Sequence, residues 1–238
     1  LGLLCVYFLV KGRWRIVAGL GMALFAIVGT SLWWAGWESH VTWYRESVLP
    51  FSSKSLAAFN VQSVDGFLLR LRPNAPLYDW TPIPVDETLR LMRTVMVGVL
   101  VTMSGIVLWA GAFRSGSKDT LHLEFSIVLC LALMISPISW THYYLFLLIP
   151  FSLYIGGRLP VQQSASWSLG MVACMLSTSL PVLFLNPSSG STLGKLFLSH
   201  YVFGALCLWG LLCFSNRRGT RTQSWPTGIR SKSYYPAS

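Results

Sequence analysis

The chain has 238 residues, of which 53% are hydrophobic and only 11% are charged, and its mean hydropathy is +0.56. Soluble domains carry about 25% charged residues, so this composition excludes an ordinary soluble protein and predicts a polytopic membrane protein. The formal net charge of +10 does not indicate a nucleic-acid partner, because basic residues of membrane proteins gather in loops that meet anionic lipid head groups.

All the cysteines lie inside apolar runs, and no CxxC pair occurs. A disulfide framework or a thiolate metal site is therefore not expected, and these side chains should pack as small apolar groups. The sequence has no HExxH motif, Gly-rich nucleotide loop or Cys/His cluster, so it predicts no metal site and no cofactor. Whether a divalent cation is needed is left open by the residues. The cysteines are Cys5, Cys130, Cys174, Cys207 and Cys213.

Apolar segments recur along the chain and predict an all-α, polytopic transmembrane fold of about six membrane segments. Leu1–Val10 is too short to span a bilayer alone and has no Met or charged leader before it, so we expect a C-terminal fragment of a longer protein. We expect residues 1–214 to form one membrane domain with an exterior loop over 37–93, and residues 215–238 to form a basic, disordered tail. The six segments are Ile16–Gly36, Thr94–Phe113, Leu121–Ile135, Tyr143–Gly157, Trp167–Leu185 and Leu196–Phe214.

Basic residues gather in every second connection between these segments. They are Lys11, Arg13 and Arg15, then Arg114 and Lys118, then Arg158, and finally Arg217, Arg218 and Arg221 in the tail. The other short connections hold no Lys or Arg over 136–142 and only Lys195 over 186–195. By the positive-inside rule the basic connections are cytoplasmic, which places 37–93 and 136–142 outside. This pattern predicts a multi-pass protein in contact with membrane lipids, in a bacterial plasma membrane.

One polar stretch, Ser136–Tyr144, interrupts two apolar runs, and we call it the polar turn. It contains a proline, two serines, a threonine, a histidine and three aromatic residues. The simplest interpretation is a tight turn between two membrane helices, with the aromatic rings in an interfacial belt. A chemical role for His142 is a separate hypothesis.

The exterior loop contains a second informative stretch, Phe59–Leu71, which we call the exterior segment. If it is helical, Gln62, Gly66 and Arg70 share one face at a spacing of four. An amide, a gap and a guanidinium in line would suit a phosphate or a sugar. The alternative is an amphipathic surface helix whose Arg70 meets lipid phosphates. Upstream, residues 43–50 predict an interfacial helix that ends at Pro50.

The remaining ionisable residues have more ordinary interpretations. We expect Asp65 to be solvated on a helix, and His122 and Glu124 to be interfacial. His200 should hydrogen-bond a backbone carbonyl, and Lys195 and Arg158 should anchor at lipid head groups.

These stretches together carry a family likeness. Ser136-Pro137-Ile138-Ser139-Trp140-Thr141-His142 resembles the signature of the polyprenyl-phosphate-mannose-dependent membrane mannosyltransferases, which form glycosyltransferase family 87 and have the GT-C architecture. Gln62-Ser63, Gly66 and Arg70 are similar to that family's Asn-Gln-Ser…Gly…Arg segment, and Lys11–Arg15 resembles its basic cytoplasmic turn. The family's Asn falls at Val61 here, with Asn60 one position early.

The resemblance implies an enzyme that transfers a hexose, mannose in this family, with inversion, from a polyprenyl-phosphate donor to a lipid or glycan acceptor on the exterior face. It implies that His142 acts in catalysis by holding the phosphate or the acceptor or by assisting proton transfer. The family's catalytic aspartate belongs to an N-terminal exterior loop that this sequence lacks, so no general base is nominated. The implied substrate-binding residues are Arg70 for the phosphate, Asn60, Gln62 and Ser63 for sugar hydroxyls, and Trp140 and Tyr143 for a sugar face or lipid.

Two other classes of function compete with this interpretation. A transporter or flippase would also be polytopic, but such proteins place polar groups near the bilayer midplane and often contain repeated halves. Here the polar groups are predicted to gather at one face, and no internal repeat is found. A non-catalytic homologue of the transferases is the second alternative.

Overall fold

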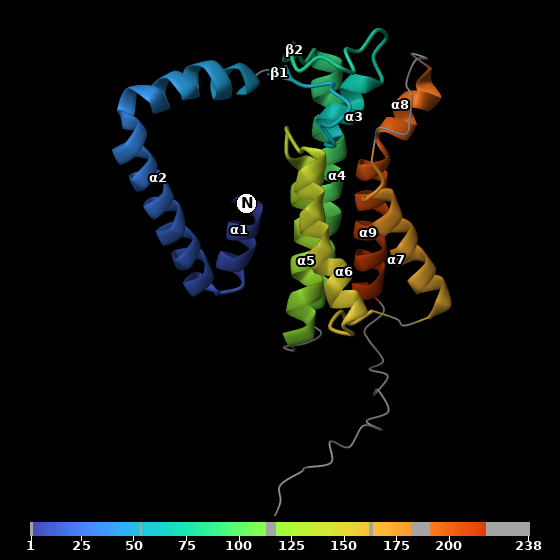
Figure 1. Cartoon of the computed structure of the whole chain (residues 1–238). Coiled ribbons are helices and arrows are strands. Elements are labelled where there is room, and N and C mark those ends of the chain that lie inside the picture. Colours follow the sequence, from blue (N-terminus) through green and yellow to red (C-terminus); the bar gives the residue numbers. More distant parts are fainter. Residues whose placement is uncertain (1, 53, 113–117, 162–163, 182–190, 218–238) are drawn as a thin grey trace, which may run out of the picture.

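The computed structural model describes residues 2–52, 54–112, 118–161, 164–181 and 191–217, and these are mostly helical (Figure 1). The first half contains α1 (Gly2–Val10), α2 (Trp14–Trp43), the π-helix η1 (Tyr44–Val48), the 3-10 helix η2 (Leu49–Ser52), β1 (Lys54–Ser55), α3 (Val64–Arg70), β2 (Ile83–Pro84) and α4 (Glu87–Ala112). The second half contains α5 (Lys118–Ile135), the 3-10 helix η3 (Thr141–Leu147), α6 (Leu148–Ile155), α7 (Ala165–Ser177), α8 (Thr192–Leu198) and α9 (His200–Arg217). The predicted helical fold is confirmed, with one two-residue antiparallel ladder, β1–β2, added in the exterior loop.

Fewer candidate membrane spans are found in the described residues than the sequence predicted. Within the described residues, two helical stretches, Trp14–Phe51 and Glu87–Gly111, are long and apolar enough to cross a membrane, and α8 with α9 makes a third if this pair, bent by 60°, is one span. The other apolar helices, Thr120–Ile135, Thr141–Ile155 and Ala165–Ser177, are shorter. About six spans are therefore not confirmed. The predicted segment 167–185 ends outside the described residues.

Helix α2 stands apart from the other helices and bends near its end. The predicted segment ended at Gly36, whereas the helix continues to Trp43 after a kink at Gly36, where φ is +76° and ψ is 164°. Glycine reaches this positive φ without a Cβ clash. Nδ1 of His40 lies 2.8 Å from the Gly36 carbonyl oxygen and its Nε2 lies 3.0 Å from Ser31 Oγ, so His40 braces the bend. None of the α2 residues is buried.

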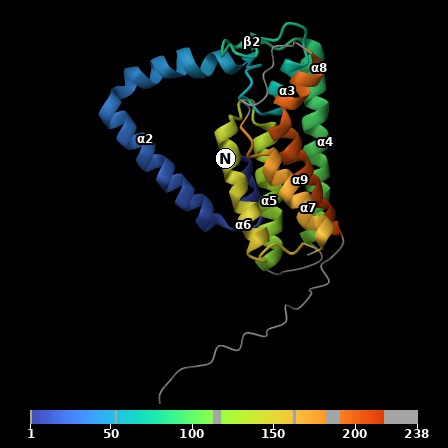
Figure 2. The ribbon, with the colours of Figure 1, turned by 45° about the vertical axis from the view of Figure 1, so that its right-hand side comes forward.

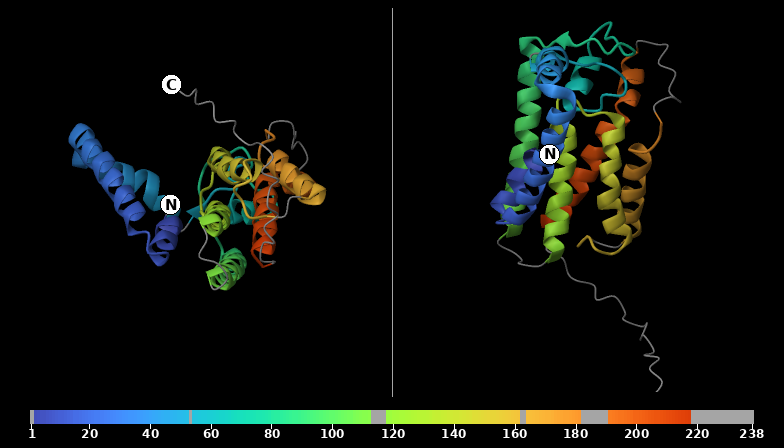
Figure 3. Two further views of the ribbon diagram at one scale, coloured as in Figure 1. Left: turned by 90° about the horizontal axis from the view of Figure 1, so that it is seen from below. Right: turned by 60° about the vertical axis from the view of Figure 1, so that its left-hand side comes forward.

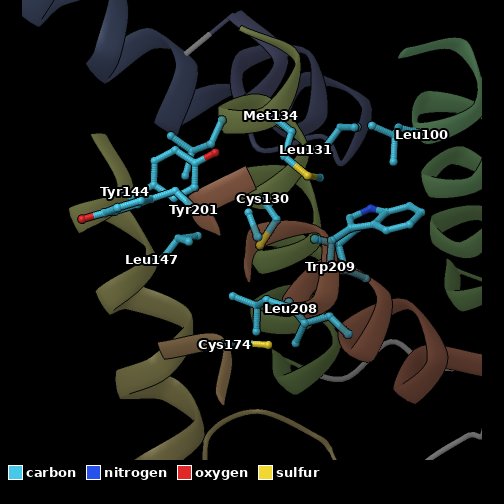
Figure 4. Packing of buried hydrophobic residues seen from close by; sticks show 14 of the residues in the cluster. Leu100, Cys130, Leu131, Met134, Tyr144, Leu147, Cys174, Tyr201, Leu208 and Trp209 are labelled. Carbon is cyan, nitrogen blue, oxygen red and sulfur yellow. The ribbon is translucent and has the colours of Figure 1, made fainter. Parts of the chain in front are cut away.

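The remaining long helices form a bundle around α5 and α9 (Figure 2). α9 packs against α4, α5 and α7, and its side chains meet those of α5 and η3 in the core (Figure 4). Three of the cysteines, Cys130, Cys174 and Cys213, are buried, as the packing prediction expected, and Cys207 is exposed. The labelled core residues of Figure 4 include Cys130, Leu131 and Met134 of α5, Tyr144 and Leu147 of η3, and Leu208 and Trp209 of α9.

A buried carboxylate joins α1 to the bundle. Glu124 of α5 is 1% exposed, accepts a hydrogen bond from Tyr7 Oη at 2.9 Å, and pairs with Lys11 Nζ at 2.7 Å. Two side chains from the α1 region therefore enclose Glu124, and its predicted position at the membrane interface stays a prediction. This contact holds α1 beside α5, while α2 lies farther out (Figure 3).

The connections sort to the two ends of the bundle. The turn between α1 and α2 lies at one end, together with the start of α5 and the end of α6 (Figure 1). α3, β1, β2, α8 and the polar turn lie at the other end (Figures 1 and 3). The loops that the positive-inside rule places on opposite sides thus lie at opposite ends, and the side of the membrane that each end faces stays a prediction.

Replacement of Gly204 by alanine tests the contact between α7 and α9. A Cβ at Gly204 would lie 2.7 Å from Thr178 Cγ2 and 2.9 Å from Ser177 Oγ, whereas a Cβ at Gly210 of the same helix would meet nothing within 4 Å. Overpacking costs about 1–3 kcal/mol, and alanine regains about 1 kcal/mol of helix propensity. We expect Gly204→Ala to lower the thermal unfolding midpoint in detergent and Gly210→Ala to keep or raise it. Equal midpoints for the two variants would show that the helices do not pack this closely.

Candidate functional site

The exterior segment and the polar turn lie against each other, although about 75 residues separate them in the sequence. Val61 and Trp140 form an isolated antiparallel bridge. Two backbone hydrogen bonds flank this bridge: the Gln62 N–H donates to the Ser139 carbonyl at 2.6 Å, and the Thr141 N–H donates to the Asn60 carbonyl at 2.9 Å. The two stretches that the sequence singled out therefore form one unit.

Side chains strengthen this junction. Ser63 caps α3 by accepting a hydrogen bond from the Gly66 N–H at 3.1 Å, and its hydroxyl donates to the Pro137 carbonyl at 3.2 Å. Tyr144 Oη donates to the Gln62 carbonyl at 2.6 Å. Because α3 begins only at Val64, Gln62 precedes it, and the predicted sharing of one helical face by Gln62, Gly66 and Arg70 is wrong for Gln62. The Ser63 hydroxyl accepts a hydrogen bond from a backbone N–H in the first turn of α3, so the helix can begin directly after the extended backbone at Ser63.

Arg70 is fully enclosed by protein. Its side chain is 0% exposed; Nη1 donates to the Ala58 carbonyl at 3.1 Å and to the Val61 carbonyl at 2.6 Å, and Nε donates to Ser199 Oγ at 3.0 Å. Burial lowers the pKa of Arg70 to about 9, so the group is still a cation at neutral pH. The alternative of a surface helix whose Arg70 meets lipid phosphates is therefore wrong. The predicted contact with a substrate phosphate stays a prediction, and it would involve Nη2, which has no partner among the described atoms.

The three polar residues before α3 differ in their accessibility. Gln62 is 0% exposed, and its Nε2 donates to the Phe59 and Leu198 carbonyls, each at 2.7 Å. Ser63 is also 0% exposed, whereas Asn60 is half-buried and its Oδ1 accepts a hydrogen bond from Trp80 Nε1 at 3.0 Å. The sugar contacts predicted for these residues stay predictions, and Asn60 is the most accessible of the three.

His142 lies at the edge of a pocket of about 270 Å³ at this end of the bundle. The pocket opens between the start of η3 and the helices α7 and α9, and it has polar and apolar walls. The polar groups come from Thr141, His142, Tyr144, Thr178, Ser179 and Tyr201, and the apolar ones from Leu145, Leu148 and Phe151. The centroid of the His142 ring lies 6.5 Å from that of Trp140, with the rings nearly parallel, and 4.6 Å from that of Tyr143. Trp140 and Tyr143 lie beside His142 but are not among the residues that line the pocket, so their predicted contacts with a sugar face or lipid stay predictions.

Sequence reasoning missed the far wall of this pocket. Thr178 and Ser179 follow α7, and Tyr201 belongs to α9. The run Ser177-Thr178-Ser179 before Pro181 ends an apolar segment, as Ser136-Pro137 does, and this similarity was the available signal. Across the described residues no group of three His, Cys, Asp or Glu side chains is placed to hold a metal ion.

Two ionisable residues near α3 are buried, contrary to expectation. Asp65 is only 7% exposed and its Oδ1 lies 2.8 Å from Arg93 Nε, so it is not solvated. Lys195 is also buried; it lies in α8, not in a turn, and its Nζ donates to the Arg72 carbonyl at 2.6 Å, so it is not a head-group anchor. The backbone contact predicted for His200 is confirmed, since Nδ1 lies 2.8 Å from the Phe197 carbonyl oxygen.

A helical bundle with two apolar stretches long enough to cross a membrane indicates a membrane protein, and a pocket with polar and apolar walls opens at one end of this bundle. A family model, glycosyltransferase family 87, matches residues 2–137, which is more than half of the chain. The chain therefore belongs to glycosyltransferase family 87, and membership indicates a sugar-transferring enzyme. The match includes the exterior segment and ends at Pro137, before His142. Comparisons with curated proteins and with solved structures found no match.

The burial of Asp65 predicts a specific pH dependence. Burial raises the pKa of Asp65 above its ordinary value of about 3.9, and the Arg93 guanidinium opposes this rise only in part. The folded state therefore binds this proton more readily, so the stability contributed by Asp65 is present at low pH and is lost as the pH rises through the raised pKa. We expect the wild-type unfolding midpoint to gain more than that of Asp65→Asn when the pH falls from neutral, through the raised pKa, toward the ordinary pKa of an aspartate.

Asp79→Asn is the matched control for this measurement. Asp79 is exposed, and hydrogen bonds from Thr81 lower its pKa, so its effect on stability has the opposite sign. The same gain in midpoint for wild type and Asp65→Asn would contradict the assigned burial.

Proposed function

We propose that this glycosyltransferase moves a hexose, mannose, from a polyprenyl-phosphate donor to a lipid or glycan acceptor, with inversion, at the end of the bundle that carries α3 and the polar turn. The observation that carries this proposal is the junction of the exterior segment with the polar turn, which puts His142 at the edge of a polar pocket. We further propose that this end faces the exterior of the cell and that the chain crosses the membrane several times.

The polar wall of the pocket suits the transfer of a phosphate-linked sugar. Such a reaction needs a base on the acceptor hydroxyl and donors that stabilise the departing phosphate. His142 would donate to the phosphate or assist the proton transfer, and the hydroxyls of Thr178 and Ser179 would donate to oxygens of donor or acceptor. The rings of Trp140 and Tyr143 beside His142 offer flat surfaces for a sugar face.

The apolar wall of the pocket supports a lipid-linked substrate. Leu145 is 66% exposed and Leu148 is 53% exposed, although both line the pocket, so this wall continues onto the outer surface of the bundle. In a bilayer, an exposed apolar surface of this kind meets hydrocarbon chains. A prenyl chain would therefore enter from the lipid side, with its phosphate near the polar wall.

The exterior segment pairs with the polar turn, whose residues form one wall of the pocket. In this proposal Asn60 meets a sugar hydroxyl, because it is the accessible polar residue of the segment. Gln62 and Ser63 contribute through their backbone and capping bonds, since their side chains are buried. A direct contact of Arg70 with the donor phosphate would be made by Nη2.

The transporter or flippase alternative is not favoured, because the chain belongs to a family of glycosyltransferases. A non-catalytic homologue would have the same fold and the same family match. Transfer activity distinguishes that alternative from the enzyme.

Replacement of His142 by alanine tests the proposed site. Membranes containing the wild-type protein should transfer labelled mannose from polyprenyl-phosphate mannose, and His142→Ala at matched expression should transfer it about 10²-fold more slowly, which is typical for loss of a positioned proton-transfer group. His40→Ala is the control, because His40 contacts only the α2 kink among the hydrogen bonds found for it. Equal rates for wild type and His142→Ala would remove His142 from the site, and no transfer by the wild type would contradict the proposed donor.

A further inference from the structure

Arg70 of α3 forms hydrogen bonds with the loop before α3 and with the break between α8 and α9. Its Nη1 holds the carbonyls of Ala58 and Val61 in the loop before α3, at 3.1 and 2.6 Å. Its Nε reaches Ser199, the residue at the break between α8 and α9, at 3.0 Å. Hydrogen bonds from a charged donor are stronger than those between neutral groups, and these lie in a site without solvent exposure.

Gly66 provides the space for this arrangement. A Cβ at Gly66 would lie 2.5 Å from the Val61 carbonyl oxygen and 3.3 Å from Arg70 Nη1. The first distance is impossible without a backbone shift, and the second would push the guanidinium away from its acceptor. A side chain at position 66 is therefore incompatible with the bond between Arg70 and Val61.

The groups that accept hydrogen bonds from Arg70 belong to segments that adjoin both walls of the pocket. Val61 forms the bridge with Trp140, and the flanking backbone bonds fix Ser139 and Thr141, next to His142. Ser199 lies two residues before Tyr201, which lines the opposite wall. One buried guanidinium thus holds the backbone behind His142 and the start of α9 at the same time.

We propose that Arg70 is a positioning residue for His142, acting through the backbone of residues 60–62 and their bridge to Trp140, and that Gly66 serves the same purpose. The catalytic part of this inference rests on the proposed function. Lysine cannot replace arginine in this role, because its single ammonium nitrogen cannot reach the Val61 carbonyl and Ser199 Oγ with the same fork.

A disulfide across the bridge reports the positioning without any activity. Val61 and Trp140 are the non-hydrogen-bonded pair of the bridge, and such pairs place their Cα atoms about 4.5 Å apart, within the range that a disulfide spans. The Val61→Cys and Trp140→Cys pair should therefore oxidise readily in membranes when Arg70 is present. Mass spectrometry of the non-reduced peptides measures the linked fraction and separates it from the native cysteines.

We expect Arg70→Lys to lower the linked fraction several-fold, whereas Arg72→Lys, a change of a partly exposed neighbouring arginine, should leave it unchanged. Ser199→Ala removes one bond and keeps Arg70, so it should give a smaller loss and decides the question if Arg70→Lys does not fold. An unchanged linked fraction in Arg70→Lys or, where that variant does not fold, in Ser199→Ala would overturn the proposal.

Kinetics separate positioning from direct phosphate binding. With the native Val61 and Trp140, Arg70→Lys should lower kcat at least about tenfold with little change in the KM for the donor, because a displaced His142 affects the reacting state more than binding. A raised KM with unchanged kcat and an intact disulfide would instead support a direct phosphate contact and overturn positioning. Absence of transfer by the wild type would contradict the proposed function, while the disulfide experiment would still decide whether Arg70 holds the bridge.

Discussion

The end of the bundle that carries α3 and the polar turn depends on a cation enclosed by backbone. Moving a guanidinium out of water costs several kcal/mol even after relaxation. The burial of Arg70 is therefore tolerated only because carbonyls and a hydroxyl accept hydrogen bonds from it. Those acceptors lie in segments that have little regular structure of their own: the loop before α3 and the break between α8 and α9. The charge therefore gives order to backbone that neither helices nor sheets hold in place.

The order that Arg70 gives to the exterior segment also affects the polar turn, which lies on the other side of the Val61–Trp140 bridge. The polar turn ends α5 at a proline and continues as a 3-10 helix, in which the hydrogen bonds are less favourable than in an α-helix. A chain segment of this kind needs partners outside itself, and the exterior segment supplies them through two backbone bonds and through the Gln62 carbonyl, which accepts a hydrogen bond from the Tyr144 hydroxyl. The pocket can then combine a polar wall fixed by this junction with an apolar wall that continues onto the outer surface of the bundle.

Apolar runs predicted the helices because the hydrophobic requirement of a membrane is local and can be counted along the sequence. The sequence predictions fail where contacts between distant segments determine the burial of a side chain or the lining of the pocket. Nothing in the spacing around Asp65 or Lys195 indicates that Arg93 or the Arg72 carbonyl will enclose it. Thr178 and Ser179 were missed because the pocket wall that they form exists only once α7 packs against α9. The kink at Gly36 also could not be predicted, since glycine is common in membrane helices.

The exterior segment shows that a motif recognised in a sequence can fit more than one ligand. A phosphate and a cluster of backbone carbonyls can both be bound by a forked, cationic donor with an open approach. The pattern of a glycine followed four residues later by an arginine therefore fits either ligand. Burial separates the two cases, because a phosphate must arrive from outside and a carbonyl need not. Since Arg70 is 0% exposed and two of its nitrogens already have protein acceptors, its main ligand is the protein's own backbone.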